Sequence, residues 1–90
     1  MMANASRVGD STQCIELGLP IIRQIAQGSS NVFIEGSPAA RLGDATTHPC
    51  AVAGGSSTVF INGRPAARVG DAVSCGGVII GGAATVSIGG

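Results

Sequence analysis

The sequence has no lysine, tryptophan or tyrosine, a single histidine, and only two phenylalanines, Phe33 and Phe60. Charged residues make up 11% of the 90 residues, and five arginines balance five acidic residues. A surface that follows the phosphates of a nucleic acid needs clustered positive charge. This composition therefore excludes a nucleic-acid partner, whereas a surface with so little charge suits burial against another protein.

The sequence also lacks long apolar segments. No apolar run approaches the roughly 18 residues that a membrane-spanning helix needs. Residues 1–7 are small and polar and are not followed by the apolar segment of a signal peptide. Because no export signal is predicted, we expect the three cysteines to be reduced thiols or metal ligands, and an odd number cannot all pair within one chain.

Large core-forming side chains are scarce as well. A chain of 90 residues forms one domain and buries only roughly 60–65% of its unfolded surface. Here the apolar residues are mainly Ala, Val and Ile, and chains with so small a core usually need a disulfide, a metal ion or a partner. We therefore expect residues 1–90 to form a single domain that depends on additional stabilisation of this kind.

What the sequence does contain is a repeat. Ser29–His48 and Ser56–Cys75 are identical at thirteen of twenty positions and are offset by 27 residues. Asn4–Asp10 matches the second half of this unit and Ala83–Gly90 its first half, so a third copy is divided between the two ends. The split predicts a closed arrangement with pseudo-threefold symmetry, in which the C-terminal strand lies beside the N-terminal segment, because an open solenoid would have two atypical ends.

Each repeat has the pattern of a short β-hairpin. Val32–Ile34 and Val59–Ile61 are β-branched or aromatic, and Asn62-Gly63 is a strong signal for a type I′ hairpin turn, in which both central residues have positive φ. The following arm contains Pro65, which belongs at a sheet edge or at the start of a strand. These signals predict an all-β fold of short hairpins.

One segment departs from the repeat. The span from Cys14 to Gly28 is twice as long as the equivalent span in the other two repeats, so an insertion falls at about residues 15–28. The apolar residues that recur there at roughly helical spacing are Ile21, Ile22, Ile25 and Ala26. With a proline at its start, this segment predicts one short helix at Pro20–Gln27. Such a helix would either cover one face of the small core or form a docking face.

Four ligand-type side chains occupy special places in the repeats. The fourth residue after each Arg-x-Gly-Asp is Cys14, His48 or Cys75, and Cys50 lies two residues past His48, on the same side of an extended segment. Together they include every cysteine and the only histidine. Threefold symmetry would bring the three equivalent positions together, and Cys50 would add a fourth ligand. Three thiolates and one imidazole are a typical set for structural zinc, with no position left for a catalytic water.

The residues alone leave other interpretations of these side chains open. The cysteines can be small buried apolar residues, with His48 at the surface. Cys50 and His48 can form a nucleophile pair, although no third orienting group is evident. The chain can also be a small zinc or thiol module for redox sensing or metal binding.

The aspartates of the repeat have a simpler interpretation. Asp10, Asp44 and Asp71 recur at the same place in every copy, which is not expected of a catalytic carboxylate pair. We expect them to form turns or to pair with the arginine three residues before each of them. No enzymatic activity is predicted.

Two further segments carry a family resemblance. Pro38–Arg41 and Pro65–Arg68 both read Pro-Ala-Ala-Arg and are each followed by x-Gly-Asp. They resemble the PAAR-repeat family, and Asn62–Asp71 is similar to its most characteristic stretch. The resemblance covers nearly the whole chain apart from the insertion. It implies a small conical β protein on the blunt end of a trimeric β-helical spike, of the VgrG type in type VI secretion systems or its phage-tail counterpart, which sharpens that spike for membrane puncture.

The resemblance also implies a zinc ion near the vertex of the cone. The positions that match the family's metal ligands are Cys14, His48, Cys50 and Cys75. Members of the family usually have more histidines and fewer cysteines at this site, and a thiolate-rich site also suits iron. Zinc is therefore the expected metal and iron the less favoured one. The first copy of the motif reads Asn-Ala-Ser-Arg and lacks the proline.

The same resemblance implies how and where the chain works. One copy is expected per spike trimer, with transient contact to a target membrane and with effector proteins on the sides of the cone as further partners. The expected location is the bacterial cytoplasm before assembly, followed by secretion or injection at the spike tip, or else the tail of a virion. Because the repeats use residues 1–90, no fused effector domain is expected.

Overall fold

The computed structural model describes residues 3–16, 18–47 and 50–89. These residues form short strands joined by turns, as predicted for an all-β protein, and they include no helix that could cross a membrane. In chain order the strands are β1 (Ala3–Asn4), β2 (Ser11–Glu16), β3 (Leu19–Gln24), β4 (Phe33–Ile34), β5 (Ser37–Pro38), β6 (Phe60–Ile61), β7 (Arg64–Pro65), β8 (Val78–Ile79) and β9 (Ser87–Ile88).

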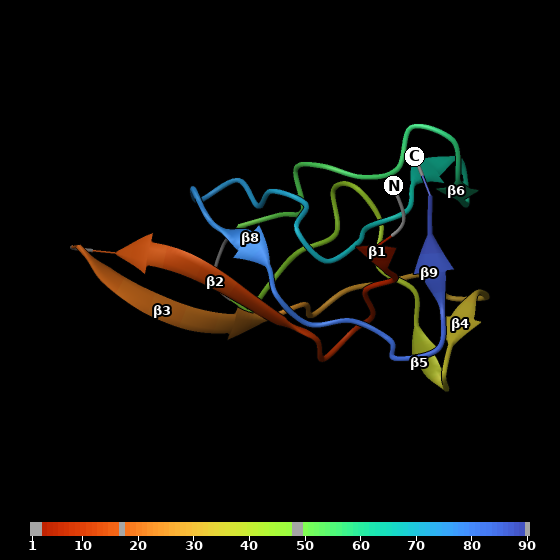
Figure 1. Ribbon diagram of the computed structural model, residues 1–90, viewed down its shortest axis with the longest axis horizontal. Helices are drawn as coiled ribbons and strands as arrows, with labels where there is room; N and C mark the ends of the chain where they lie inside the picture. The colour runs from red at the N-terminus through yellow and green to blue at the C-terminus, as the bar shows by residue number, and fades with distance from the viewer. Residues whose placement is uncertain (1–2, 17, 48–49, 90) are drawn as a thin grey trace.

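Each repeat forms the predicted antiparallel hairpin. β4 pairs with β5 and β6 pairs with β7, and in both pairs a phenylalanine lies opposite a proline. The third hairpin is made by the two ends of the chain, because β9 pairs with β1 through Asn4↔Ser87 and Ala3↔Ile88. β1 and β9 lie side by side in Figure 1. The prediction that the C-terminal strand lies beside the N-terminal segment is confirmed.

The turns of the two continuous hairpins have the expected backbone. Glu35 and Asn62 have φ values of 51° and 54°, and Gly36 and Gly63, which follow them, have values of 84° and 78°. Positive φ at both central positions defines a type I′ turn. Asparagine tolerates this region better than most residues, whereas glutamate does so only where the surrounding structure requires it. Glu35 is therefore held in its turn by its tertiary contacts.

A ring of three backbone hydrogen bonds lies where the repeats meet. The amide of Ser6 donates to the carbonyl of Ala67, that of Ala67 to Ala40, and that of Ala40 to Ser6, each over 3.0 Å. Ser6, Ala40 and Ala67 are equivalent positions of the three repeats and are almost completely buried. The ring closes only if the third repeat contacts both others, so the pseudo-threefold closure predicted from the split repeat is confirmed.

The core consists of two small clusters, one on either side of this ring. The base cluster contains Ala5, Ile34, Ala39, Ile61, Ala66, Ala83 and Ile88. The insertion cluster contains Cys14, Ile25, Ala40, Val52, Ala67, Val73 and Ile79, with Cys75 packed against it. We call the end of the molecule with β4–β5, β6–β7 and β9 the base end and the end with β2 and β3 the insertion end (Figure 1). The molecule measures 35 × 26 × 23 Å and narrows towards the insertion end.

The prediction of a helix at Pro20–Gln27 is wrong. Residues Leu19–Gln24 form strand β3 instead, and this strand pairs with β2 at six positions, from Ser11↔Gln24 to Glu16↔Leu19. β2 also pairs with β8, so the insertion makes a three-stranded sheet with β2 at its centre. Exposure from residue 21 to residue 26 alternates from one residue to the next, which is the period of a strand. The β-branched isoleucines favour a strand. The pairing with β2 therefore decides the structure of this segment, although its apolar residues recur at roughly helical spacing.

Candidate metal centre

Two of the predicted ligands meet at the insertion end. Cys14 lies on the central strand β2 and is completely buried. Cys75 ends the repeat Ser56–Cys75, 61 positions later, and its Sγ atom lies 2.6 Å from the Sγ atom of Cys14. Residues four positions after equivalent aspartates therefore do converge, as the symmetry argument predicts for this pair.

Close backbone packing holds the Cys75 segment against β2. A Cβ atom on Gly77 would lie 1.7 Å from the carbonyl oxygen of Gln13 and 2.8 Å from the Cα atom of Cys14. Only glycine allows such an approach. The neighbouring Gly76 has a φ of 89° and turns the chain, so two consecutive glycines bring Cys75 to Cys14. The sequence shows both glycines but not which strand they approach.

The third cysteine also reaches this place. Cys50 is buried, and its carbonyl accepts a hydrogen bond from the amide of Thr46 over 2.9 Å. Its thiol lies close enough to Cys75 to act on the pKa of that thiol. Burial, and then the hydrogen bond with Cys14, raise the pKa of the Cys75 thiol, whereas Cys50 acts in the opposite direction. Three thiols from three repeats thus gather at the insertion end. The fourth predicted ligand, His48, lies outside the described residues.

The donor set fits the chemistry of a thiolate-rich metal site, although its geometry is not that of a finished one. Within residues 3–16, 18–47 and 50–89, no group of three or more His, Cys, Asp or Glu side chains is arranged to hold a metal ion. The side chains that would hold a metal ion here are Cys14, Cys50 and Cys75, and such an ion would supply bonds between the repeats.

The predicted pairing of each repeat aspartate with its arginine is confirmed. The pairs are Arg7–Asp10, Arg41–Asp44 and Arg68–Asp71. In each pair one carboxylate oxygen accepts from the arginine's backbone N–H and from its Nε, at 2.8 and 3.0 Å, while the other oxygen accepts from Nη2 at 2.9 Å. These bonds to aspartate raise the pKa of all three arginines. The carboxylates therefore hold the turns of the three repeats.

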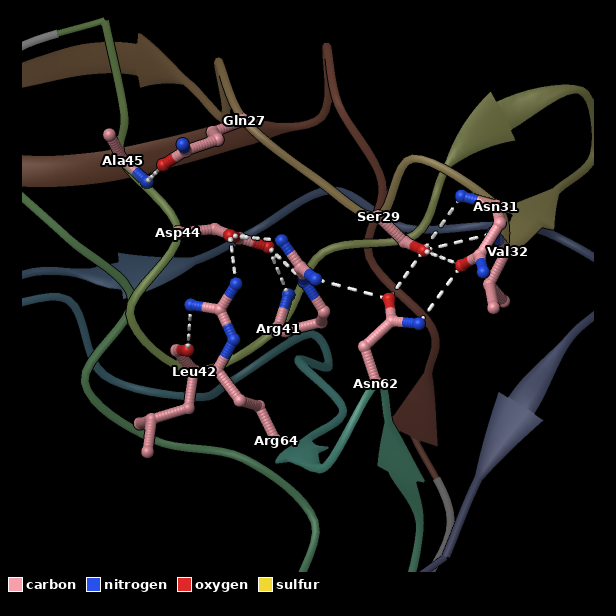
Figure 2. Close-up of polar contacts among 10 residues, drawn as sticks. All are labelled: Gln27, Ser29, Asn31, Val32, Arg41, Leu42, Asp44, Ala45, Asn62 and Arg64. Carbon is pink, nitrogen blue, oxygen red and sulfur yellow. Dashed lines mark hydrogen bonds and ion pairs between the residues drawn. The ribbon is translucent and has the colours of Figure 1, made fainter.

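Asp44 is the most buried of the three aspartates. Its side chain has no exposed surface, and a second arginine, Arg64, lies with its Nη2 atom 3.6 Å from Oδ1. Arg64 also donates to the carbonyl of Leu42 over 3.3 Å. Figure 2 shows the guanidinium groups of Arg41 and Arg64 both reaching the carboxylate of Asp44. This second arginine has no counterpart in the sequence of the preceding repeat, where the equivalent residue is Ser37.

The first turn residue of each hairpin binds the preceding repeat. Oδ1 of Asn62 accepts from Nη1 of Arg41 at 3.1 Å and from Oγ of Ser29 at 2.6 Å, and Nδ2 of Asn62 donates to Asn31 (Figure 2). At the equivalent place in the third repeat, the carbonyl of Gly89 accepts from Arg68 and Ser56. The sequence around Asn62 indicates only a turn, because the partners of its side chain lie more than twenty positions away.

Glu35 makes the corresponding contacts with the divided repeat. Its carboxylate accepts from Nη1 of Arg7 at 2.8 Å, from the amide of Thr85 at 3.0 Å, and from the hydroxyl of Thr85. These bonds from Thr85 first of all, and then the charge of Arg7, lower the pKa of Glu35. Glu35 thereby ties the first complete hairpin to both ends of the chain.

The base end carries the two aromatic side chains. Phe33 and Phe60 are 58% and 56% exposed, and each lies at the outward position of its hairpin while Ile34 and Ile61 point into the base cluster. The equivalent position of the third hairpin is Ser87, which is also exposed. Two equivalent phenylalanines at the surface of a chain with so few aromatic residues mark this end as a candidate contact surface.

Comparison with known proteins agrees with this arrangement. A family model for the PAAR motif matches residues 3–54 and 47–81, which together span most of the chain. No curated protein matches the chain. Proteins with this motif are structural components of the spike tip in type VI secretion and related contractile systems, and they generally sit on VgrG spike trimers. The split threefold repeat, its Arg–Asp turns and the family match have one explanation: this chain belongs to the PAAR-motif family.

Proposed function

We propose that this chain caps a trimeric β-helical spike of the VgrG type or of a phage tail, with one copy per trimer. The observation that supports this most is the closed ring of three equivalent repeats. A monomer with pseudo-threefold symmetry can offer one similar surface to each chain of a true trimer. Capping also covers the open strand edges of the spike, which would otherwise pair with other chains.

The base end is the surface that we propose for docking. Phe33 and Phe60 can each insert between the chains of the trimer, while Ser87 takes the third equivalent place. Large aromatic side chains contribute much of the free energy of protein association when they become buried. The insertion end then points away from the spike, towards the membrane to be punctured, and effector proteins would bind the sides of the cone.

We also propose that a zinc ion stabilises the insertion end, held by Cys14, His48, Cys50 and Cys75. The support is the gathering of three thiols from the three repeats. The metal would supply bonds between repeats whose apolar contacts are few, and it would have no catalytic role because all its positions are filled by the protein. Iron is the less favoured metal for the same thiols.

The chain would be made in the bacterial cytoplasm and leave it on the spike tip, or be built into a virion tail. The alternative of a small redox-sensing or metal-binding module draws support from one observation, the contact between Cys14 and Cys75. That contact is compatible with a spike-tip role and is considered separately below.

Docking can be tested with the spike protein encoded nearest to this chain. The two purified proteins are mixed, and the mass of the complex is measured by size-exclusion chromatography with light scattering. We expect three spike chains to one copy of this chain, and we expect the double variant Phe33→Ser, Phe60→Ser to lose at least about tenfold in affinity, as for buried aromatic anchors. The matched control is Ile22→Ser, because Ile22 is 54% exposed at the insertion end. Binding lost only in the control would show that the base end is not the docking surface.

A further inference from the structure

We propose that Cys14 and Cys75 form a reversible disulfide whenever the insertion end carries no metal, and that Cys50 keeps its thiol. The part of this proposal in which bound metal prevents the disulfide rests on the zinc site proposed above, whereas the formation of the disulfide itself does not.

The first support is the position of the two sulfurs. They are in direct contact, 2.6 Å apart. A disulfide bond of about 2.05 Å between them therefore needs only a small movement of the two side chains.

The second support is that the backbone fixes the pair. Cys14 lies at the centre of the three-stranded sheet, opposite Ile21 of β3. Gly77 packs directly on the backbone of Gln13 and Cys14, where a Cβ atom would not fit. A disulfide needs its two Cα atoms within about 7 Å, and this packing keeps the Cys75 segment against the strand that carries Cys14.

The third support is a difference in access between the two thiols. Cys14 has no exposed surface, whereas Cys75 is partly exposed. An oxidant therefore reaches Cys75 first, and the buried Cys14 lies ready to react with the oxidised product. Access to solvent beside a resolving thiol favours oxidation of this pair, whereas the raised pKa of Cys75 makes its reaction with the oxidant slow.

With hydrogen peroxide as the oxidant the reaction balances. The Cys75 sulfur attacks one peroxide oxygen, an S–O bond forms and the O–O bond breaks, and hydroxide leaves and takes up the thiol proton as water. The Cys14 sulfur then attacks the resulting sulfenic acid, an S–S bond forms and the S–O bond breaks, and a second water leaves with the Cys14 proton. Two thiols are oxidised by two electrons and one peroxide is reduced to two waters, and a small dithiol reverses the reaction.

The consequence concerns a chain that leaves a reducing compartment. If the chain loses its metal outside the cell, the disulfide joins the segments that carry Cys14 and Cys75 at the insertion end, where the metal had joined them. Closing a loop of 61 positions removes conformational freedom from the unfolded chain, as a metal bridge would. The two stabilising links exclude each other because both use the same sulfurs.

The positions of the arginines make this site easy to map. Trypsin cuts after arginine but not before proline, so it places the three cysteines on separate peptides, 8–23, 42–68 and 69–90. The full-length protein is prepared in two forms, loaded with zinc and stripped by a chelator, and folding of both is checked by circular dichroism. Each form is treated with hydrogen peroxide, the remaining thiols are alkylated, and the digest is analysed by mass spectrometry.

In the stripped form we expect a loss of about 2 Da per chain, peptides 8–23 and 69–90 joined to each other, and an alkylated Cys50. In the zinc-loaded form the same cross-link forms at least about tenfold more slowly, because bound metal occupies both sulfurs. Cys50→Ser should leave the cross-link unchanged, and protein unfolded in urea should give mixed pairings. A folded stripped chain that joins Cys50 instead, or that shows no loss of mass, would overturn the proposal. Equal rates in both forms would overturn its metal protection. A chain that never binds zinc would refute the zinc site and leave the cross-link test intact.

Discussion

At the scale of single residues, the carboxylate of Asp44 is the charged group that depends most on its partners, because it is completely buried. Three hydrogen bonds from Arg41 and the charge of Arg64 surround it, and no part of its side chain is exposed. The equivalent carboxylate of Asp71 has the same three bonds but retains some contact with water. The two Arg-x-Gly-Asp motifs are alike in sequence, and the two carboxylates differ only in their burial and in their neighbours in the fold.

We therefore expect Asp44→Asn to destabilise the fold by about 3–5 kcal/mol, the usual cost of leaving a buried charge without its partner. Asp71→Asn should cost clearly less, because water can solvate Arg68 in part. Urea unfolding followed by circular dichroism measures both. Equal losses of stability in the two variants would contradict the importance of burial at Asp44.

Glu35 gives the fold a dependence on pH. Its pKa is lower in the folded chain than the ordinary value of 4.5, chiefly through its bonds from Thr85. The ionised carboxylate therefore stabilises the fold above the unfolded pKa, and this contribution is lost as the pH falls through the folded pKa. Glu35→Gln removes it, so the stability of the variant should approach that of the parent as the pH is lowered from about 7 to about 3. A difference in unfolding free energy that stays constant over this range would exclude the contribution.

At the scale of elements, the insertion is the part that makes the three repeats unequal. In place of the short connection of the other two repeats, β2 and β3 extend the insertion end and form a sheet with β8. Gln13 of β2 pairs with Ile22 on one side and Val78 on the other. The sheet depends on the close approach of the chain at Gly77 to β2.

Gly77→Ala should break that approach. A methyl group there would overlap the carbonyl of Gln13, so the Cys75 segment must move away from Cys14. We expect a loss of several kcal/mol, in the range of severe backbone clashes, together with a lower zinc content after purification. Gly76→Ala is the matched control: its Cβ atom meets open space, and positive φ costs only about 1–2 kcal/mol. Thermal unfolding and metal analysis should rank the two variants in this order.

At the scale of the whole molecule, closure of the ring compensates for a small core. Each repeat contributes one hairpin, one Arg–Asp turn and one member of the central ring of hydrogen bonds, and none of these units is large enough to be stable alone. The base cluster and the insertion cluster contain mainly Ala, Val and Ile. Such a core leaves much of the stability to links between repeats, of which the proposed metal is the strongest.

Metal removal should therefore have a large effect. Protein purified under reducing conditions is expected to contain about one zinc per chain, by analogy with small structural zinc domains. A chelator should lower its melting temperature by tens of degrees, since about 1 kcal/mol corresponds to 4–8 °C in a domain of this size. Added zinc should restore it, and Cys75→Ala should abolish the restoration. A melting temperature that is the same with and without zinc would show that the thiols do not stabilise the fold through a metal.

The sequence by itself determined the repeat, and through it most of the architecture. Three copies of one unit have equivalent surroundings only around a threefold axis, so the split copy was enough to predict the closed ring and the pairing of the chain ends. The β-branched and aromatic residues before each turn, and the turn at Asn62, predicted the hairpins, and the recurrence of Asp with Arg predicted their pairing. Each of these features either recurs along the chain or involves residues close together in the sequence, so it can be recognised from the sequence alone.

Only the tertiary structure decided the rest. The insertion is not repeated, so no second copy shows its period, and pairing with β2 made residues 19–24 a strand although their spacing also suits a helix. The contact of Glu35 with Thr85 joins residues 50 positions apart, and the repeat gives no sign of it. No local pattern specifies such contacts, because they arise when the ring closes and brings distant parts of the chain to the same place.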